Sequence, residues 1–347
     1  MRRRRPERRS SEAGFSLIEL MVSLGLTLVV LGGSFRAMDD ARKASEAAAM
    51  IADGSQNLRM AVTLITRDAI QTGRELPSGG IPIPRGTGVL QIRRPGPPGA
   101  VLTFPSTWTT LPSICPGSGL GPTINGVATD IVTVAYADAT LALIAYPLTS
   151  ILSDGSGMTV DNRTVITDAL TGLRAGDLIM FTNALGNAIQ TVTSITGQNV
   201  FFASGSADDT FGFNQRNATS GSIMQIRSGT TFPTTSATRV TMVTYNLDAT
   251  TAPDQVRLMR TERFLAPRLV AMGIENLQLT YDIVDGTTNP TNQVDAVAPN
   301  SPSQIRKVNL FVSRRSEETF TQTRQRMRSS IATQVSLRSM SFMDRYR

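Results

Sequence analysis

The sequence of 347 residues contains no histidine and a single cysteine, Cys115. Without histidine the chain cannot build Ser-His-Asp or Cys-His catalytic sites, and it lacks the commonest ligand of catalytic zinc. One cysteine excludes an intramolecular disulfide, and no neighbouring base or cation in "PSICPGSG" supports a reactive thiolate at Cys115. The sequence therefore predicts a protein that is not an enzyme and that holds no cofactor.

Aromatic residues are also scarce, at 5 %, and the net charge of +7 is unevenly distributed. Residues 1–14 carry six arginines against Glu7 and Glu12, which accounts for +4 of the total. A basic chain raises nucleic acid as a partner, but here most of the charge belongs to the first 14 residues. The abundance of Thr, Ser and Gly favours strands and turns beyond the N-terminal third.

The longest apolar run covers residues 15–35 and contains one charged residue, Glu19. As a helix it would span about 30 Å, the thickness of a bilayer core, with the arginine-rich end in the cytoplasm. A secretory signal peptide has a shorter apolar core of about 7–15 residues, followed by a small-residue cleavage site. A plain membrane anchor fits the length, but it gives no reason for a glutamate inside the run.

The stretch "GFSLIEL" at 14–20, after a basic leader, resembles the processing motif of type IV prepilins and type II secretion pseudopilins. The resemblance implies that prepilin peptidase removes residues 1–14 by cutting between Gly14 and Phe15. It further implies that Phe15 is N-methylated and that Glu19 takes part in filament assembly.

The chemistry of the membrane gives this glutamate a role. A carboxylate in hydrocarbon is costly unless it is protonated or paired. Cleavage would create a buried α-amine at Phe15, and Glu19 of one subunit and the amine of a neighbour could neutralise each other. We hypothesise that this pair fixes the axial register between subunits.

After residue 35 the sequence predicts that the helix continues over 36–76 as an amphipathic segment. Leu58, Ala61, Val62, Ile65 and Ala69 form one apolar stripe that should dock on the head, whereas Arg67 and Asp68 fall off it. "DGS" at 53–55 predicts a break or kink, and the prolines from Pro77 onward end the helix. Gly25, Gly32 and Gly33 favour either close helix packing or a segment that stretches in a filament.

Residues 77–347 should form a β-rich head, in which the Pro- and Gly-rich stretch 77–125 is an insertion at the rim of the sheet. Segments 163–168, 176–183, 188–196 and 199–204 predict an antiparallel meander. The other expected strands are 130–137, 222–229, 239–247, 255–263, 275–286, 305–316 and 334–342. The predicted fold is α+β and pilin-like, with a long N-terminal helix whose first half spans the membrane.

Several head segments are similar to PilW-type minor pilins, which are related to J-class pseudopilins of type II secretion. They are "LRAGDLIMFTNALGNAIQTVTSITGQNVFFAS" (173–204), "GIENLQLTYDI" (273–283), "IRKVNLFVSRRSEE" (305–318) and "VSLRSMSFMDRY" (335–346). The resemblance implies a minor pilin that primes assembly at the filament tip. Its partners would be other minor and major pilins and the inner-membrane assembly platform, with the head in the periplasm. The alternatives are a type II secretion pseudopilin, or a tip adhesin or DNA-uptake pilin.

Two further sets of residues are candidate binding sites in the head. A basic cluster near the C-terminus could contact DNA if its side chains share one surface, and otherwise it is the solvated face of strands; its candidates are Arg314, Arg315, Arg324 and Arg328. In "DGSGMTVDN", Asp154 and Asp161 offer oxygen ligands for calcium, although their spacing matches no EF-hand loop and a polar turn is the alternative.

Overall fold

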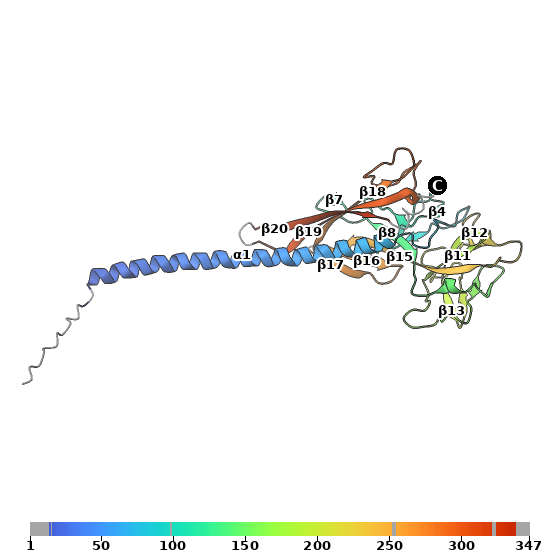
Figure 1. Cartoon of the computed structure of the whole chain (residues 1–347), viewed down its shortest axis with the longest axis horizontal. Helices are drawn as coiled ribbons and strands as arrows, with labels where there is room; N and C mark the ends of the chain where they lie inside the picture. The colour runs from blue at the N-terminus through green and yellow to red at the C-terminus, as the bar shows by residue number, and fades with distance from the viewer. Residues whose placement is uncertain (1–13, 15, 98, 252–254, 321–323, 338–347) are drawn as a thin grey trace, which may run out of the picture.

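The computed structural model describes residues 14, 16–97, 99–251, 255–320 and 324–337. Its main feature is helix α1 (Leu17–Gln71), 55 residues long, whose first half projects alone from the head in Figure 1. The helix passes through 53–55 without interruption, so the predicted break is wrong. It ends earlier than expected, because Gly73 adopts a φ of 76° and its N–H bonds to the carbonyl of Ala135.

The second half of α1 docks on the head through the predicted stripe. Leu58, Ala61, Ile65 and Ala69 are at most 4 % exposed and Val62 packs against the same core, so the stripe is confirmed. The helix contacts strands of two different sheets, β19 and β20 on one hand and β17 and β8 on the other. In Figure 1, β19 and β20 lie on one side of the helix and β17 on the other, so the helix fills the seam between the two sheets.

The largest sheet has seven strands built around β15 (Ser236–Asp248), 13 residues long and almost wholly buried. One edge of β15 pairs with β8, from Val240 to Tyr245. The other edge pairs with β11 up to Val240 and with β16 from Val243 onward. The remaining strands extend this core outward. The partners are β5 (Ile114–Cys115), β8 (Val132–Ala137), β11 (Leu178–Asn183), β12 (Gly186–Thr191), β16 (Arg257–Glu262) and β17 (Arg268–Met272).

A three-stranded antiparallel sheet closes the other side of the helix. It has the order β18 (Ile274–Ile283), β19 (Ile305–Thr319) and β20 (Arg326–Ser336). Strand β18 alternates buried and partly exposed residues, and the inward row of β19 includes Val308, Leu310 and Val312, which join the core under α1. The last predicted strand, 334–342, begins inside β20, and residues 338–342 lie outside the described part of the chain.

The stretch 77–125 is part of the core as well as of the rim, which corrects the sequence prediction. It contributes Ile81, Ile92, Phe104 and Leu111 to a buried cluster under the main sheet, and β5 pairs with β8. Proline and glycine limit its strands to two residues each, but their side chains still reach the core. These strands are β1 (Ile81–Pro82), β2 (Arg93–Arg94), β3 (Leu102–Thr103), β4 (Thr110–Leu111) and β6 (Thr123–Ile124), which is followed by β7 (Val127–Ala128).

Two predicted strands are wrong, and the predicted meander is divided between two sheets. Residues 163–168 form a turn and an irregular segment that buries Ile166, and 222–229 contains the 3₁₀ helix η2 (Ile223–Ile226). The hairpin β11–β12 belongs to the main sheet, whereas the following strands form a separate four-stranded sheet. That sheet has the order β13 (Ser194–Thr196), β14 (Asn199–Phe201), β10 (Gly157–Thr159) and β9 (Ser150–Ile151).

The two other short helices are η1 (Leu143–Ala145) and η3 (Pro302–Gln304). Apart from these segments, each predicted strand within the described residues overlaps a strand of the structure. The fold class, a long N-terminal helix with an antiparallel β-rich head, is as predicted.

Candidate functional site

The N-terminal end of α1 places the predicted assembly residue in the first turn of the helix. The backbone N–H of Ser16 donates to Oε2 of Glu19 at 3.2 Å, so the carboxylate occupies a position that stabilises helix N-termini. Gly14, the predicted cleavage residue, is exposed and lies just before this turn. Phe15, the predicted methylation site, lies outside the described residues.

The helix then presents a continuous apolar surface to the outside. Its bulky apolar side chains between Leu17 and Phe35 are 46–79 % exposed, and no other part of the described chain covers them. By length and composition this segment is able to cross a membrane. Three hydroxyl side chains inside it, on Ser23, Thr27 and Ser34, bond to carbonyls one turn earlier and so need no outside partner.

Residues 9–35 match the family described as the prokaryotic N-terminal methylation motif. This match supports a type IV pilin-like or pseudopilin-like protein. A signal of this class implies processing by prepilin peptidase and membrane-associated pilin assembly. No curated protein and no solved structure matches the chain significantly.

A buried ionic network fixes the pilin-like helix to the head. Asp68 is 1 % exposed, and its Oδ2 accepts hydrogen bonds from the Tyr245 hydroxyl at 2.7 Å and from Arg260 Nε at 2.8 Å. Arg260 also pairs with Glu262 at 3.1 Å. Burial and the Asp68 charge raise the pKa of Tyr245, so its hydroxyl stays a donor. Asp68 therefore faces the head, contrary to its predicted place off the buried stripe.

The C-terminal arginines do not share one surface. Arg314 and Arg315 are neighbours on β19; Arg314 is 6 % exposed and its guanidinium lies against Gly54 of α1. Arg315 pairs in register with Arg328, whose Nε bonds to Glu275 at 2.8 Å. Arg324 is exposed and has a φ of 52°. This scatter, together with the acid paired to Arg328, argues against a DNA-binding surface formed by the four residues.

The two calcium candidates are each engaged by a guanidinium. Asp154 pairs with Arg216 at 2.6 Å and also accepts from Ser156, whereas Asp161 pairs with Arg163 at 2.8 Å. Among the residues that the structure describes, no group of three or more His, Cys, Asp or Glu could hold a metal ion. Both carboxylates act as turn-stabilising acceptors in this arrangement.

Cys115 lies on β5 and is fully buried beside Arg94. Burial raises the pKa of its thiol to about 12, although the Arg94 charge acts in the opposite direction. Arg94 is itself 2 % exposed and donates to the carbonyls of Pro116, Cys115 and Ile131 and to the Thr133 hydroxyl. This one side chain therefore joins the stretch 77–125 to the main sheet.

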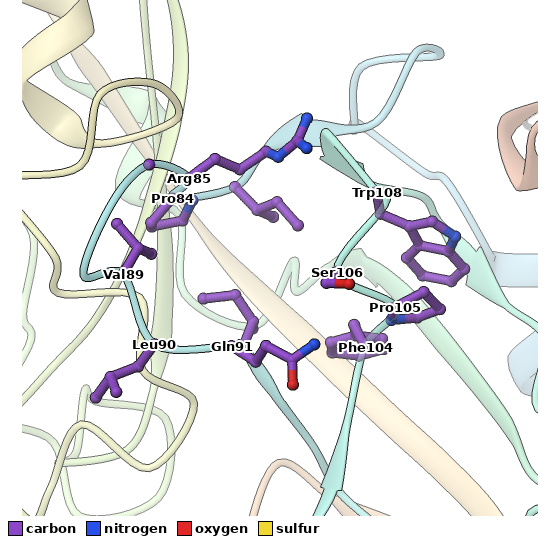
Figure 2. Close-up of a pocket in the computed structure, with 12 residues that line it drawn as sticks. Pro84, Arg85, Val89, Leu90, Gln91, Phe104, Pro105, Ser106 and Trp108 are labelled. Atoms are coloured by element: carbon purple, nitrogen blue, oxygen red, sulfur yellow. The ribbon is translucent and has the colours of Figure 1, made fainter.

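The same stretch lines a pocket of about 210 Å³. Figure 2 shows Leu90 and Trp108 on opposite sides of it, with Gln91 and Ser106 between them. Trp108 stacks on Phe104 with ring centroids 5.8 Å apart, and Phe104 is buried in the core below. The pocket is thus held by a packed aromatic pair and bordered by an exposed loop.

The sequence predictions missed three features of the site. The first is the capping contact of Glu19, although Ser16-x-x-Glu19 is a recognisable helix-start pattern that indicates it. The partners of Asp68 are 177 and 192 residues away, so no local pattern reveals them. The contact between Gly54 and Arg314 is equally distant in sequence, although a glycine inside a long helix is a hint of close approach.

Proposed function

We propose that this protein is a minor pilin of the type IV pilus that helps to initiate assembly and sits in the tip complex. The observation that carries the proposal is the combination in α1 of a prepilin-type start with an uncovered apolar half and a docked second half. An apolar surface of this length needs lipid before assembly and neighbouring helices afterwards. The head then remains outside the helical core, where it can meet other subunits.

Glu19 has two successive roles in this proposal. In the free chain it caps the helix through the Ser16 N–H, and in the filament it neutralises the α-amine of a neighbouring subunit. Removing it leaves that amine unpaired in an apolar surrounding, which costs several kcal/mol by analogy with buried ion pairs, about 3–5. The processed amine is that of Phe15, and prepilin peptidase is the enzyme that exposes it.

The test is to produce the full chain in cells that lack their own copy and to analyse the sheared filaments. We expect wild-type protein in the filament fraction, with a methylated N-terminus at Phe15 by mass spectrometry, and restored piliation. Glu19→Ala should lower incorporation at least tenfold, whereas Asp40→Ala, at an exposed position of the helix, should not.

Other outcomes select among the remaining functions. Incorporation only into a secretion pseudopilus, with loss of export in the deletion strain, would identify a type II secretion minor pseudopilin. Normal piliation with loss of adhesion or of DNA uptake would identify a tip ligand-binding role, and DNA binding should then weaken steeply with salt. Absence of the chain from every filament would contradict a pilin function.

A further inference from the structure

The place where α1 leaves the head contains a charged side chain that has no partner among the residues the structure describes. Arg314 continues the inward row of β19 after Val308, Leu310 and Val312, beyond the end of the apolar core. The residue is 6 % exposed, and its side chain has neither a hydrogen bond nor an ion pair to the described residues. The guanidinium nitrogens are not sealed from solvent, so an acceptor that enters the adjoining pocket can reach them.

The guanidinium is held in place by the shape of the helix. It lies so close to the Gly54 backbone that a Cβ at position 54 would overlap its Nη1 and Cζ atoms. Glycine therefore forms a notch in the helix surface that admits the planar group. This contact explains why Gly54 is buried in a segment whose neighbours are exposed, and it fixes the direction of the side chain.

Arg314 also lines an open pocket of about 210 Å³. One wall is a face of α1, the other is the β17–β18 turn and the end of β19. The lining residues are Met50, Asp53, Asn57, Met272, Gly273, Arg314, Arg315 and Ser316. Asp53 is an exposed residue of the lining, and it forms no ion pair with Arg314 in the described structure. The pocket thus combines a fixed cation, an amide at Asn57 and room for another group.

We propose that this pocket receives a carboxylate side chain, Asp or Glu, from a neighbouring pilin-type subunit that packs along α1. The inference rests on the proposed function, because it requires a neighbour on the helix. A planar guanidinium binds carboxylates through paired hydrogen bonds, and such charge-assisted bonds are strong where water is excluded. The incoming acid satisfies the buried cation, so this contact selects acid-bearing neighbours and sets their position.

The location favours a protein over a lipid headgroup as the source of the anion. Eighteen residues separate Phe35, the end of the apolar stretch, from Asp53, which corresponds to about 27 Å of helix. The headgroup layer is only about 5–8 Å thick on each side of the bilayer core. The pocket opens where the docked half of the helix gives way to the bare half, so a subunit that covers the bare half also reaches the pocket.

Photo-crosslinking in assembling cells tests the proposal. In the full chain, a photoreactive amino acid, p-benzoylphenylalanine, replaces Gln56, an exposed residue next to the pocket that does not line it, and crosslinked peptides are identified by mass spectrometry. We expect a crosslink to another pilin-type subunit, at a segment with an Asp or Glu within one helical turn. Replacement of that acid by its amide should lower the crosslinked fraction at least tenfold. A crosslink to lipid, or to a segment without an acid, would overturn the proposal.

Three variants separate the pocket from general stability. Arg314→Gln removes the cation and should lower the crosslinked fraction at least tenfold. Gly54→Ala should do the same by a different route, because the new methyl group displaces the guanidinium into the pocket without removing its charge. Arg268→Gln is the matched control: it removes an exposed arginine of β17 outside the pocket and should leave the crosslink unchanged.

The incorporation assay distinguishes failure of this inference from failure of the proposed function. Thermal unfolding of each purified full chain in micelles shows first whether the head is intact. If wild-type chain enters filaments and folded Arg314→Gln enters equally well with an unchanged crosslink, the carboxylate pocket is wrong and the pilin function stands. If wild-type chain enters no filament, the proposed function itself fails.

Discussion

At the scale of single residues, Asp68 has the largest consequence, although the apolar pattern of α1 predicts that it lies off the buried stripe. Asp68 lies next to the apolar stripe of α1, yet it accepts two hydrogen bonds from the head and is shielded from water. Its charge is balanced by Arg260, which in turn pairs with Glu262. The helix is therefore attached by a specific polar contact as well as by apolar packing.

Replacing Asp68 by Ala should destabilise the docked structure by about 3–5 kcal/mol, because Arg260 would remain buried without its main acceptor. The measurement is denaturant unfolding of the full chain in micelles, followed by fluorescence of Trp108, the single tryptophan. Asp40→Ala, on the exposed part of the helix, should change the unfolding free energy by less than about 0.5 kcal/mol. Equal effects of the two substitutions would contradict the attachment through Asp68.

Cys115 gives a second prediction at this scale. Its thiol has a pKa of about 12 against an ordinary value near 9, so at pH 8 the folded protein contains about a thousandfold less thiolate than the unfolded chain. Reaction with a thiol reagent should be negligible in the native protein and complete after denaturation. Because burial favours the protonated thiol, stability should fall as the pH rises from about 9 towards 12. Rapid native labelling at pH 8 would show that the thiol is accessible.

At the scale of elements, α1 has two halves with different requirements. An isolated helix is marginal in water, so the docked half depends on the packing of its apolar stripe against both sheets. The free half has no protein partner within the described structure. Under the proposed function, its side chains contact lipid or neighbouring subunits.

This division predicts opposite responses to the same substitution. Leu58→Ala removes a side chain that is 2 % exposed and should cost about 2–5 kcal/mol of head stability. Leu28→Ala, at 61 % exposed, should leave Trp108-detected unfolding unchanged within about 0.5 kcal/mol, but it should impair incorporation into filaments. If both changes altered unfolding alike, the two halves would not be independent.

The elements also show how far the sequence can predict this protein. The helix and its stripe follow from local periodicity, and most strands from alternation, because each pattern is set by neighbouring residues. The 3₁₀ helix at 223–226 reads as a strand by composition alone, and the core role of 77–125 is hidden by its prolines. In the candidate site, Gly14 and Glu19 are predicted by motif, whereas the contacts Asp68–Tyr245 and Gly54–Arg314 join segments that are distant in sequence.

At the scale of the whole molecule, the chain occupies three surroundings in succession along one helix. Residues 17–35 suit lipid, residues 36–49 lie largely in water, and residues 54–71 pack on the head. The middle segment is supported mainly by surface pairs such as Lys43–Asp39 and Arg42–Glu46, each worth about 0.2–0.5 kcal/mol.

Amide hydrogen exchange of the full chain in micelles should therefore be fastest within α1 at residues 36–49. Residues 58–71 should exchange slowest, because their opening requires the seam with both sheets to separate. Residues 17–35 should be protected only while the micelle is present. Uniform protection along the helix would argue against this three-part division.

The seam between the two sheets also determines how the molecule responds to force. The buried stripe and the Asp68 contact run parallel to the axis of α1, so tension applied to the free end of the helix shears the seam along its length. In shear, all of these contacts resist together, whereas in peeling they would break one after another. A filament that retracts under tension would therefore pull on this subunit in its mechanically strongest direction.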